Sequence, residues 1–188
     1  MIFFFLIKVI YFYILAICLA ILEIQIEGVD GWAAKLPAWR VKVGSRLDKL
    51  YKKIFQHKEL TGYHLALNIF LLLFLHWPFV WSWQWNIWAE LEILAIFVLF
   101  TVVWDFLWFV LNPNFSLRKF NKSNAWWHKK WWGWLPVDYY LAVLFSMLLL
   151  LPETVAINPV EGTFKILALL GINLILVAAT VIFYPKAY

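Results

Sequence analysis

Five long apolar stretches constrain this chain more than any other feature of its sequence. They cover residues 2–22, 61–81, 87–111, 137–151 and 164–184. A helix crosses the hydrocarbon core of a bilayer with about 20 apolar residues, so only the fourth stretch, with 15 residues, is short. We expect that span to be anchored by Tyr139 and Tyr140 or to thin the bilayer locally. The sequence predicts one all-α integral membrane domain, residues 1–188, with five transmembrane helices.

Composition agrees with this class. Hydrophobic residues make up 65% of the chain and the mean hydropathy is +0.79, well outside the usual range of soluble domains. The first stretch is predicted to be a retained helix rather than a signal peptide, because Lys8 is its only charge and no basic run precedes it. The single Cys18 excludes an intrachain disulfide and a cysteine-based metal site.

Among the loops that join the stretches, only alternate ones carry basic residues. Eight lie between the first two stretches and five between the third and fourth: Lys35, Arg40, Lys42, Arg46, Lys49, Lys52, Lys53, Lys58, Arg118, Lys119, Lys122, Lys129 and Lys130. The positive-inside rule therefore predicts an inner-membrane protein with its N-terminus outside and its C-terminus in the cytoplasm. The net charge of +5 then faces one leaflet, which suits anionic lipid headgroups better than nucleic acid.

Both basic loops carry amphipathic features. The segment 45–58 is predicted to be an interfacial helix, because Ser45 and Asp48 have capping-box spacing and five apolar residues recur at helical spacing: Leu47, Leu50, Tyr51, Ile54 and Phe55. The loop 112–136 is rich in tryptophan and lysine, a composition typical of the membrane interface.

Polar residues inside the spans are the candidates for function. A carboxylate at membrane depth costs roughly 2.5–3.5 kcal/mol, and Asp105 lies within the third span. At 100° per residue, Thr101, Asn112 and Asp105 lie about 20°, 40° and 60° from Glu90, so the four form one stripe that we expect to face the bundle interior. Glu92 points the opposite way, near the outer end, where it is expected to reach water.

Equal distances from a tight hairpin near Trp83 and Gln84 place His64 level with Asp105. We therefore predict a His64–Asp105 pair near the cytoplasmic side and assign both residues as candidate catalytic groups. His76 lies level with Glu92, and whether it pairs with Glu90 or Glu92 stays open.

The predicted topology brings six acidic and histidine residues to one depth near the cytoplasmic interface: Glu23, Glu27, His64, Asp105, His128 and Asp138. Carboxylate and imidazole groups suit a divalent metal such as Zn, Fe or Mn and equally suit acid–base catalysis. No HExxH or HxxxH motif is present. The signal is thus a shared depth, not a diagnostic spacing.

Each of these residues also has a plain structural interpretation. In this interpretation, Glu23 and Glu27 are solvated at a helix end, and His64 makes a hydrogen bond to a neighbouring helix. His128 is placed in the interface, and Asp138 to cap the fourth helix. Asp105 could make a purely structural hydrogen bond.

Three functions remain open on these residues. The first is a small membrane enzyme, metal-dependent or acid–base, that acts on a lipid-like substrate. The second is an accessory or scaffold subunit that works as a homo-oligomer or with a membrane partner. The third is a transporter or proton-pathway component, against which stands the absence of internal repeats.

Overall fold

The computed structural model describes residues 2–55, 58–82, 84–115, 117–156 and 158–184. Its helices are α1 (Ile2–Glu27), α2 (Arg46–Ile54), α3 (Gly62–Ser82), α4 (Ile87–Leu111), α5 (Val137–Ala156) and α6 (Pro159–Phe183). A 3₁₀ turn, η1 (Leu117–Lys119), and a two-stranded hairpin, β1 (Trp131–Trp132) and β2 (Leu135–Pro136), precede α5. Five of the helices are long and apolar enough to cross a membrane. The prediction of five spans is confirmed, and α4 has the predicted bounds.

The predicted short fourth span was wrong. The sequence-based boundary stopped before Pro152, but α5 continues through this proline to Ala156 and has 20 residues. α6 then begins at Pro159, with Asn158 as its N-cap. Because α5 reaches the ordinary length for a span, neither local thinning nor a special anchor is required.

α4 is the central helix of the bundle. It packs against α1 and α5, while α6 packs against both α1 and α5. Its side chains Leu107 and Phe109 are completely buried. Ala16 and Ala20 of α1 are also completely buried and belong to the same hydrophobic cluster. Small residues let helices approach closely, so these alanines allow α1 to pack tightly against α4 and α6.

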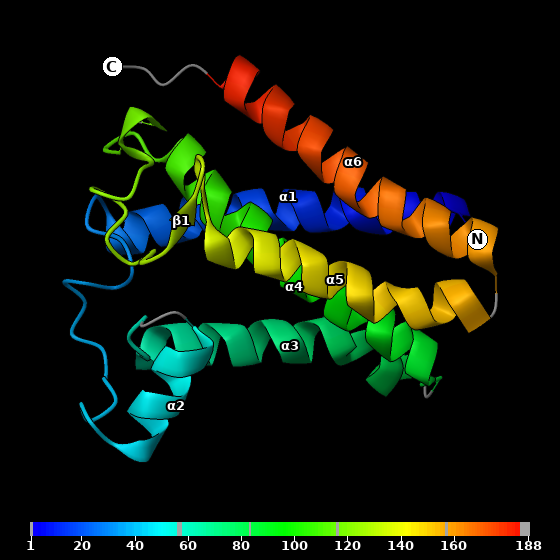
Figure 1. Cartoon of the computed structure of the whole chain (residues 1–188), viewed down its shortest axis with the longest axis horizontal. Helices are drawn as coiled ribbons and strands as arrows, with labels where there is room; N and C mark the ends of the chain where they lie inside the picture. Colours follow the sequence, from blue (N-terminus) through cyan, green and yellow to red (C-terminus); the bar gives the residue numbers. More distant parts are fainter. Residues whose placement is uncertain (1, 56–57, 83, 116, 157, 185–188) are drawn as a thin grey trace.

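α3 stands apart from this four-helix core. In Figure 1 it runs beside α4 with α2 folded against its first turns, and α4 is its principal neighbour. The one face that α3 turns toward the core includes the buried residues His64, Leu71 and Leu75. This arrangement leaves space between α3 and the rest of the bundle.

An ion-pair cluster centred on the buried Glu92 and Lys165 joins the four core helices at the end far from α2. Lys165 of α6 lies 3.1 Å from Glu92 and 2.8 Å from Glu153, and Lys8 of α1 also pairs with Glu92. The expectation that Glu92 reaches water was wrong, because its side chain is buried between these two lysines. Tertiary packing, not the helix end, decides its surroundings.

The helix predicted over 45–58 is shorter than expected. α2 covers Arg46–Ile54, and the hydroxyl of Ser45 accepts a hydrogen bond from the Asp48 amide as predicted. The Asp48 carboxylate accepts from the amide of Gly44 rather than completing the box at Ser45. Residues 56 and 57, at the end of the predicted helix, lie outside the described residues.

Candidate functional site

A cavity of about 750 Å³ lies between α3, α4 and α5. Tyr51, Ile54 and Phe55 at the end of α2 contribute to its lining. Acidic and basic side chains gather at one end of the cavity, where α1 and α4 end and α3 and α5 begin. They are Glu23, Glu27, Lys58, His64, Asp105 and Asp138. The remainder is mainly apolar. A mainly apolar pocket with a few convergent polar groups is typical of a ligand site.

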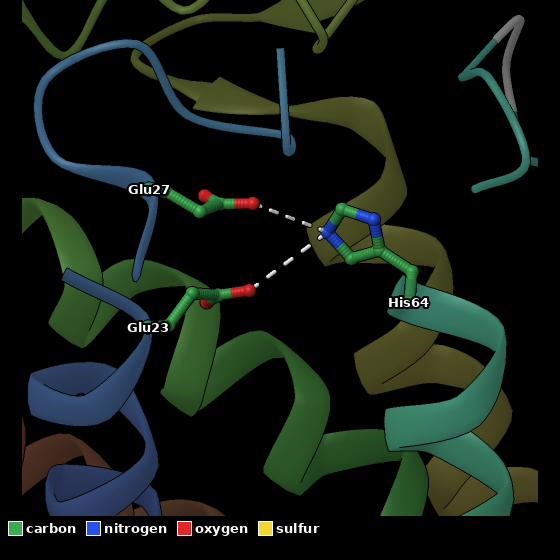
Figure 2. A group of neighbouring side chains, drawn as sticks. All are labelled: Glu23, Glu27 and His64. Carbon is green, nitrogen blue, oxygen red and sulfur yellow. Dashed lines mark ion pairs between the residues drawn. The ribbon is translucent and has the colours of Figure 1, made fainter. Parts of the chain in front are cut away.

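One compact group at this end of the cavity consists of Glu23, Glu27 and His64 (Figure 2). The Nε2 atom of His64 lies 3.8 Å from an oxygen of Glu23 and 3.6 Å from an oxygen of Glu27. One ligand atom from each residue lies within 4.8 Å of the other two. Glu23 and Glu27 share a face of α1 because they are four residues apart.

These distances fit a shared ion better than hydrogen bonds. Hydrogen bonds to nitrogen are about 2.7–3.2 Å long, shorter than both contacts of His64. Two ligands at about 2.1 Å from a tetrahedral ion stand roughly 3.4 Å apart. The three side chains therefore converge on a space of suitable size for a divalent metal.

Neighbouring groups fix the orientation of these three side chains. Nδ1 of His64 lies 2.8 Å from the hydroxyl oxygen of Thr61, which is completely buried. This bond leaves Nε2 directed at the carboxylates, as metal-binding histidines require. The indole of Trp32 stacks on the His64 ring, with centroids 4.0 Å apart, and the amide of Ala33 donates to Glu27.

The loop that supplies Trp32 and Ala33 is conformationally strained. Both residues have positive φ, at 48° and 50°, a region that costs a residue with a Cβ roughly 1–2 kcal/mol. The preceding Gly31 also has positive φ, and a Cβ built there would lie 2.5 Å from the ring of Trp127. Strain of this kind persists only where the surrounding structure holds it. Here the loop lies between Trp127 on one side and Glu27 and His64 on the other.

We expect Gly31→Ala to destabilise the protein by about 2–4 kcal/mol, because left-handed strain adds to overlap with Trp127. Gly133→Ala is the matched control, since Gly133 also has positive φ but has no heavy atom near its Cβ position. It should cost only about 1–2 kcal/mol. Unfolding in mild detergent would measure both variants. Equal losses would show that the contact with Trp127 contributes nothing.

A second group of charged side chains lies at the same end of the cavity and consists of Asp105, His128, Asp138 and Lys58. Nε2 of His128 lies 3.1 Å from Asp105, and its Nδ1 lies 3.0 Å from Asp138. The hydroxyl of Tyr139 also donates to Asp105, and the ammonium of Lys58 lies 3.0 Å from Asp138. The side chain of His128 is fully buried behind the two carboxylates.

The geometry of His128 requires a charged ring. Each ring nitrogen faces a carboxylate oxygen, and an ionised carboxylate only accepts hydrogen bonds, so both nitrogens must donate. Burial of the ring opposes its charge, but the Asp105 carboxylate and the hydrogen bonds to both acids outweigh it and raise the pKa of His128 above 6.5. The second group is thus two carboxylates balanced by two cations.

This shift predicts a pH-dependent stability. Because the pKa of His128 is higher in the folded protein, its contribution is fully present below about pH 6.5 and is lost as pH rises through the folded-state pKa. The thermal midpoints of the wild type and His128→Gln, measured from below about pH 6.5 upward, should therefore converge as pH increases. A constant difference between the two curves would contradict the charged ring.

The structure corrects the predicted direct pair of His64 with Asp105. Asp105 bonds to His128 and Tyr139, whereas His64 faces Glu23 and Glu27. The reason is that the loop before α5 folds back over the end of α4 and inserts His128, which a comparison of two neighbouring helices could not reveal.

All six predicted site residues nevertheless meet at one end of the bundle. Five of them line the cavity, and His128 supports it from behind. At the opposite end His76 lies 3.0 Å from Glu90, which settles the pairing that the sequence left open. Trp83, at the centre of the predicted hairpin, lies outside the described residues.

The predicted polar stripe of α4 does not form one continuous surface. Asn112 is completely buried and donates to the carbonyl of Gly28, while the hydroxyl of Thr101 donates to Val98 within its own helix. Glu90 belongs to the pair at the far end.

Sequence reasoning missed three residues of the site. Lys58 was counted only as one of many loop lysines, and Tyr139 only as an interfacial anchor. Thr61 carried a usable signal, because it stands three residues before His64, one helical turn away. The chain matches no protein-family model, no curated protein and no solved structure.

Proposed function

We propose that this protein is an integral membrane enzyme that uses a divalent metal to act on a lipid-like substrate. The observation that carries the proposal is the convergence of Glu23, Glu27 and His64 on one space at the polar end of a mainly apolar cavity. Three protein ligands leave coordination positions free for water or substrate, as catalytic metal sites require. One nitrogen and two oxygen donors suit Zn, Fe or Mn.

Asp105 is the proposed acid–base partner. Asp105 lines the same cavity, while hydrogen bonds to His128 and Tyr139 hold the orientation of its carboxylate. His128 does not line the cavity and therefore acts as a positioning residue. A metal held by Glu23, Glu27 and His64 would supply Lewis-acid chemistry toward the substrate or a water, and Asp105 would accept or return a proton.

The cavity favours an enzyme over the two alternatives. Polar residues that serve only helix packing would be enclosed by neighbouring helices, whereas these carboxylates line a volume of about 750 Å³. A continuous polar pathway is also poorly supported, because Thr101 and Asn112 bond within the protein. The two basic loops lie at the same end of the bundle as the site (Figure 1), and the positive-inside rule assigns that end to the cytoplasm.

Metal content of protein purified in mild detergent without chelator tests the proposal. After loading with Zn, Mn or Fe and removal of excess ion, we expect about one ion per wild-type chain. Glu27→Gln and His64→Ala should each lose at least tenfold in affinity, because even the loss of a residue that only supports a ligand costs about 10–100-fold. Asp105→Asn should keep the ion, because its contacts belong to the second group.

His76→Ala and Glu90→Gln provide a matched control. His76 of α3 and Glu90 of α4 form a histidine–glutamate pair at the end of the bundle far from the site. Both substitutions should leave the metal content unchanged. Equal metal content in His64→Ala and His76→Ala would sink the proposed site. So would a wild type that takes up none of the three ions.

A further inference from the structure

Away from its polar end, the cavity offers a surface for a hydrocarbon chain. Apolar side chains of three helices line it: Leu65 and Leu72 of α3, Phe97 and Val98 of α4, and Leu141 and Phe145 of α5. Asn68 and Thr101 also lie there, and each donates a hydrogen bond to a carbonyl of its own helix. This wall would stabilise a bound chain through apolar burial, at about 0.8 kcal/mol per methylene.

The volume is suitable for one such chain. About 750 Å³ lies within the usual range of small-molecule sites, about 300–1,000 Å³. At about 30 Å³ for a water-sized group, it accommodates on the order of 25 non-hydrogen atoms. A long chain with a small polar end is of this size.

The polar end is electrically balanced once the proposed ion is bound. Glu23 and Glu27 together balance one divalent cation. Asp105 and Asp138 are balanced by the His128 ring and by Lys58, whose ammonium lies 3.0 Å from Asp138. Among the described residues that line the cavity, Lys58 is the only lysine or arginine, and its ammonium also lies 4.7 Å from the centre of the Trp32 ring. Among the described lining residues, no lysine or arginine is therefore left to pair with an anionic headgroup.

We propose that the substrate is a lipid that places one hydrocarbon chain between α3, α4 and α5 and presents an uncharged oxygen-bearing group, such as an ester or alcohol, to the polar end. This inference rests on the proposed function, because the metal is part of the balance. A charged headgroup would add an unpaired charge inside the cavity, and a buried charge without a partner is costly. An uncharged oxygen can approach the metal without that cost.

Photolabelling with four matched probes tests this substrate class. Each probe is a 16-carbon chain with a diazirine near its end, and the polar ends are a methyl ester, an alcohol, a carboxylate and a trimethylammonium group. Metal-loaded protein in nanodiscs is illuminated and the labelled peptides are identified by mass spectrometry. Labelling of Phe97, Val98 and Phe145 is divided by labelling of the exposed α6 residues Leu174 and Ile175, which corrects for partition into the bilayer.

The ester and alcohol should label the cavity at least fivefold more than either charged probe. Ala142→Trp, which fills the cavity from α5, should reduce ester labelling at least fivefold. Ala178→Trp on the exposed part of α6 should not. Equal or stronger cavity labelling by a charged probe overturns the inference, as does ester labelling that Ala142→Trp leaves unchanged.

Metal content measured on the same samples separates the two proposals. Ala142→Trp should retain the ion, because the three proposed ligands lie on α1 and α3. A charged-probe preference with the ion in place would refute the substrate class alone. A wild type without the ion refutes the proposed function, and with it the charge balance on which the substrate class rests.

Discussion

Chelation should lower the thermal midpoint of the metal-loaded wild type by about 10 °C. A ligand that binds only the folded state stabilises it by about 4 kcal/mol when its free concentration is a thousand times its dissociation constant. For a chain of this size, each kcal/mol corresponds to roughly 2–4 °C. The ion would join α1 to α3 through Glu23, Glu27 and His64, and α3 is the spanning helix least tied to the core.

The variants make this measurement specific. His64→Ala should unfold at the same temperature with and without chelator, because it lacks a metal ligand. Asp105→Asn should retain the response to chelator even if its own midpoint is lower. A chelator response that persists in His64→Ala would place the ion elsewhere in the protein.

Lys165→Met should destabilise the protein by about 3–5 kcal/mol, the cost expected when one partner of a buried ion pair is removed. Lys165 is 5% exposed and lies within 4 Å of carboxylates of Glu92, Glu153 and Glu161. Without the ammonium, Glu92 keeps only Lys8, and Glu153 and Glu161 lose their partner. Denaturant titration in detergent would measure the loss.

Two further variants control this experiment. Lys165→Arg keeps the charge and should recover most of the stability. Lys119→Met removes an exposed lysine and should change stability by less than about 0.5 kcal/mol. If Lys165→Met were as stable as Lys119→Met, the cluster would contribute no net stability to the joined helices.

The spans could be predicted because a bilayer-crossing helix needs only length and hydrophobicity, which are local properties of the sequence. The bounds of α4 were predicted correctly for this reason, and the Ser45 cap was predicted from a spacing of three residues. The end of α5 was missed because a proline usually ends a helix, yet Pro152 is accommodated within it. Helix packing decides such an exception.

The site itself was only partly predictable. Its residues could be named, because charged side chains at membrane depth are rare and costly. Their partners could not, because the loop 112–136 carries His128 between Asp105 and Asp138, and no periodicity specifies how that loop folds back.

The sequence alone was sufficient to predict five apolar spans and to place six acidic and histidine residues at one depth. Hydrophobic length and charge placement along the chain are sufficient for that. Only the tertiary structure decided that His64 faces Glu23 and Glu27, that Glu92 is buried between two lysines, and that α3 stands far enough from α5 to leave a cavity. These outcomes depend on how side chains from distant segments pack, and packing is a property of the assembled helices.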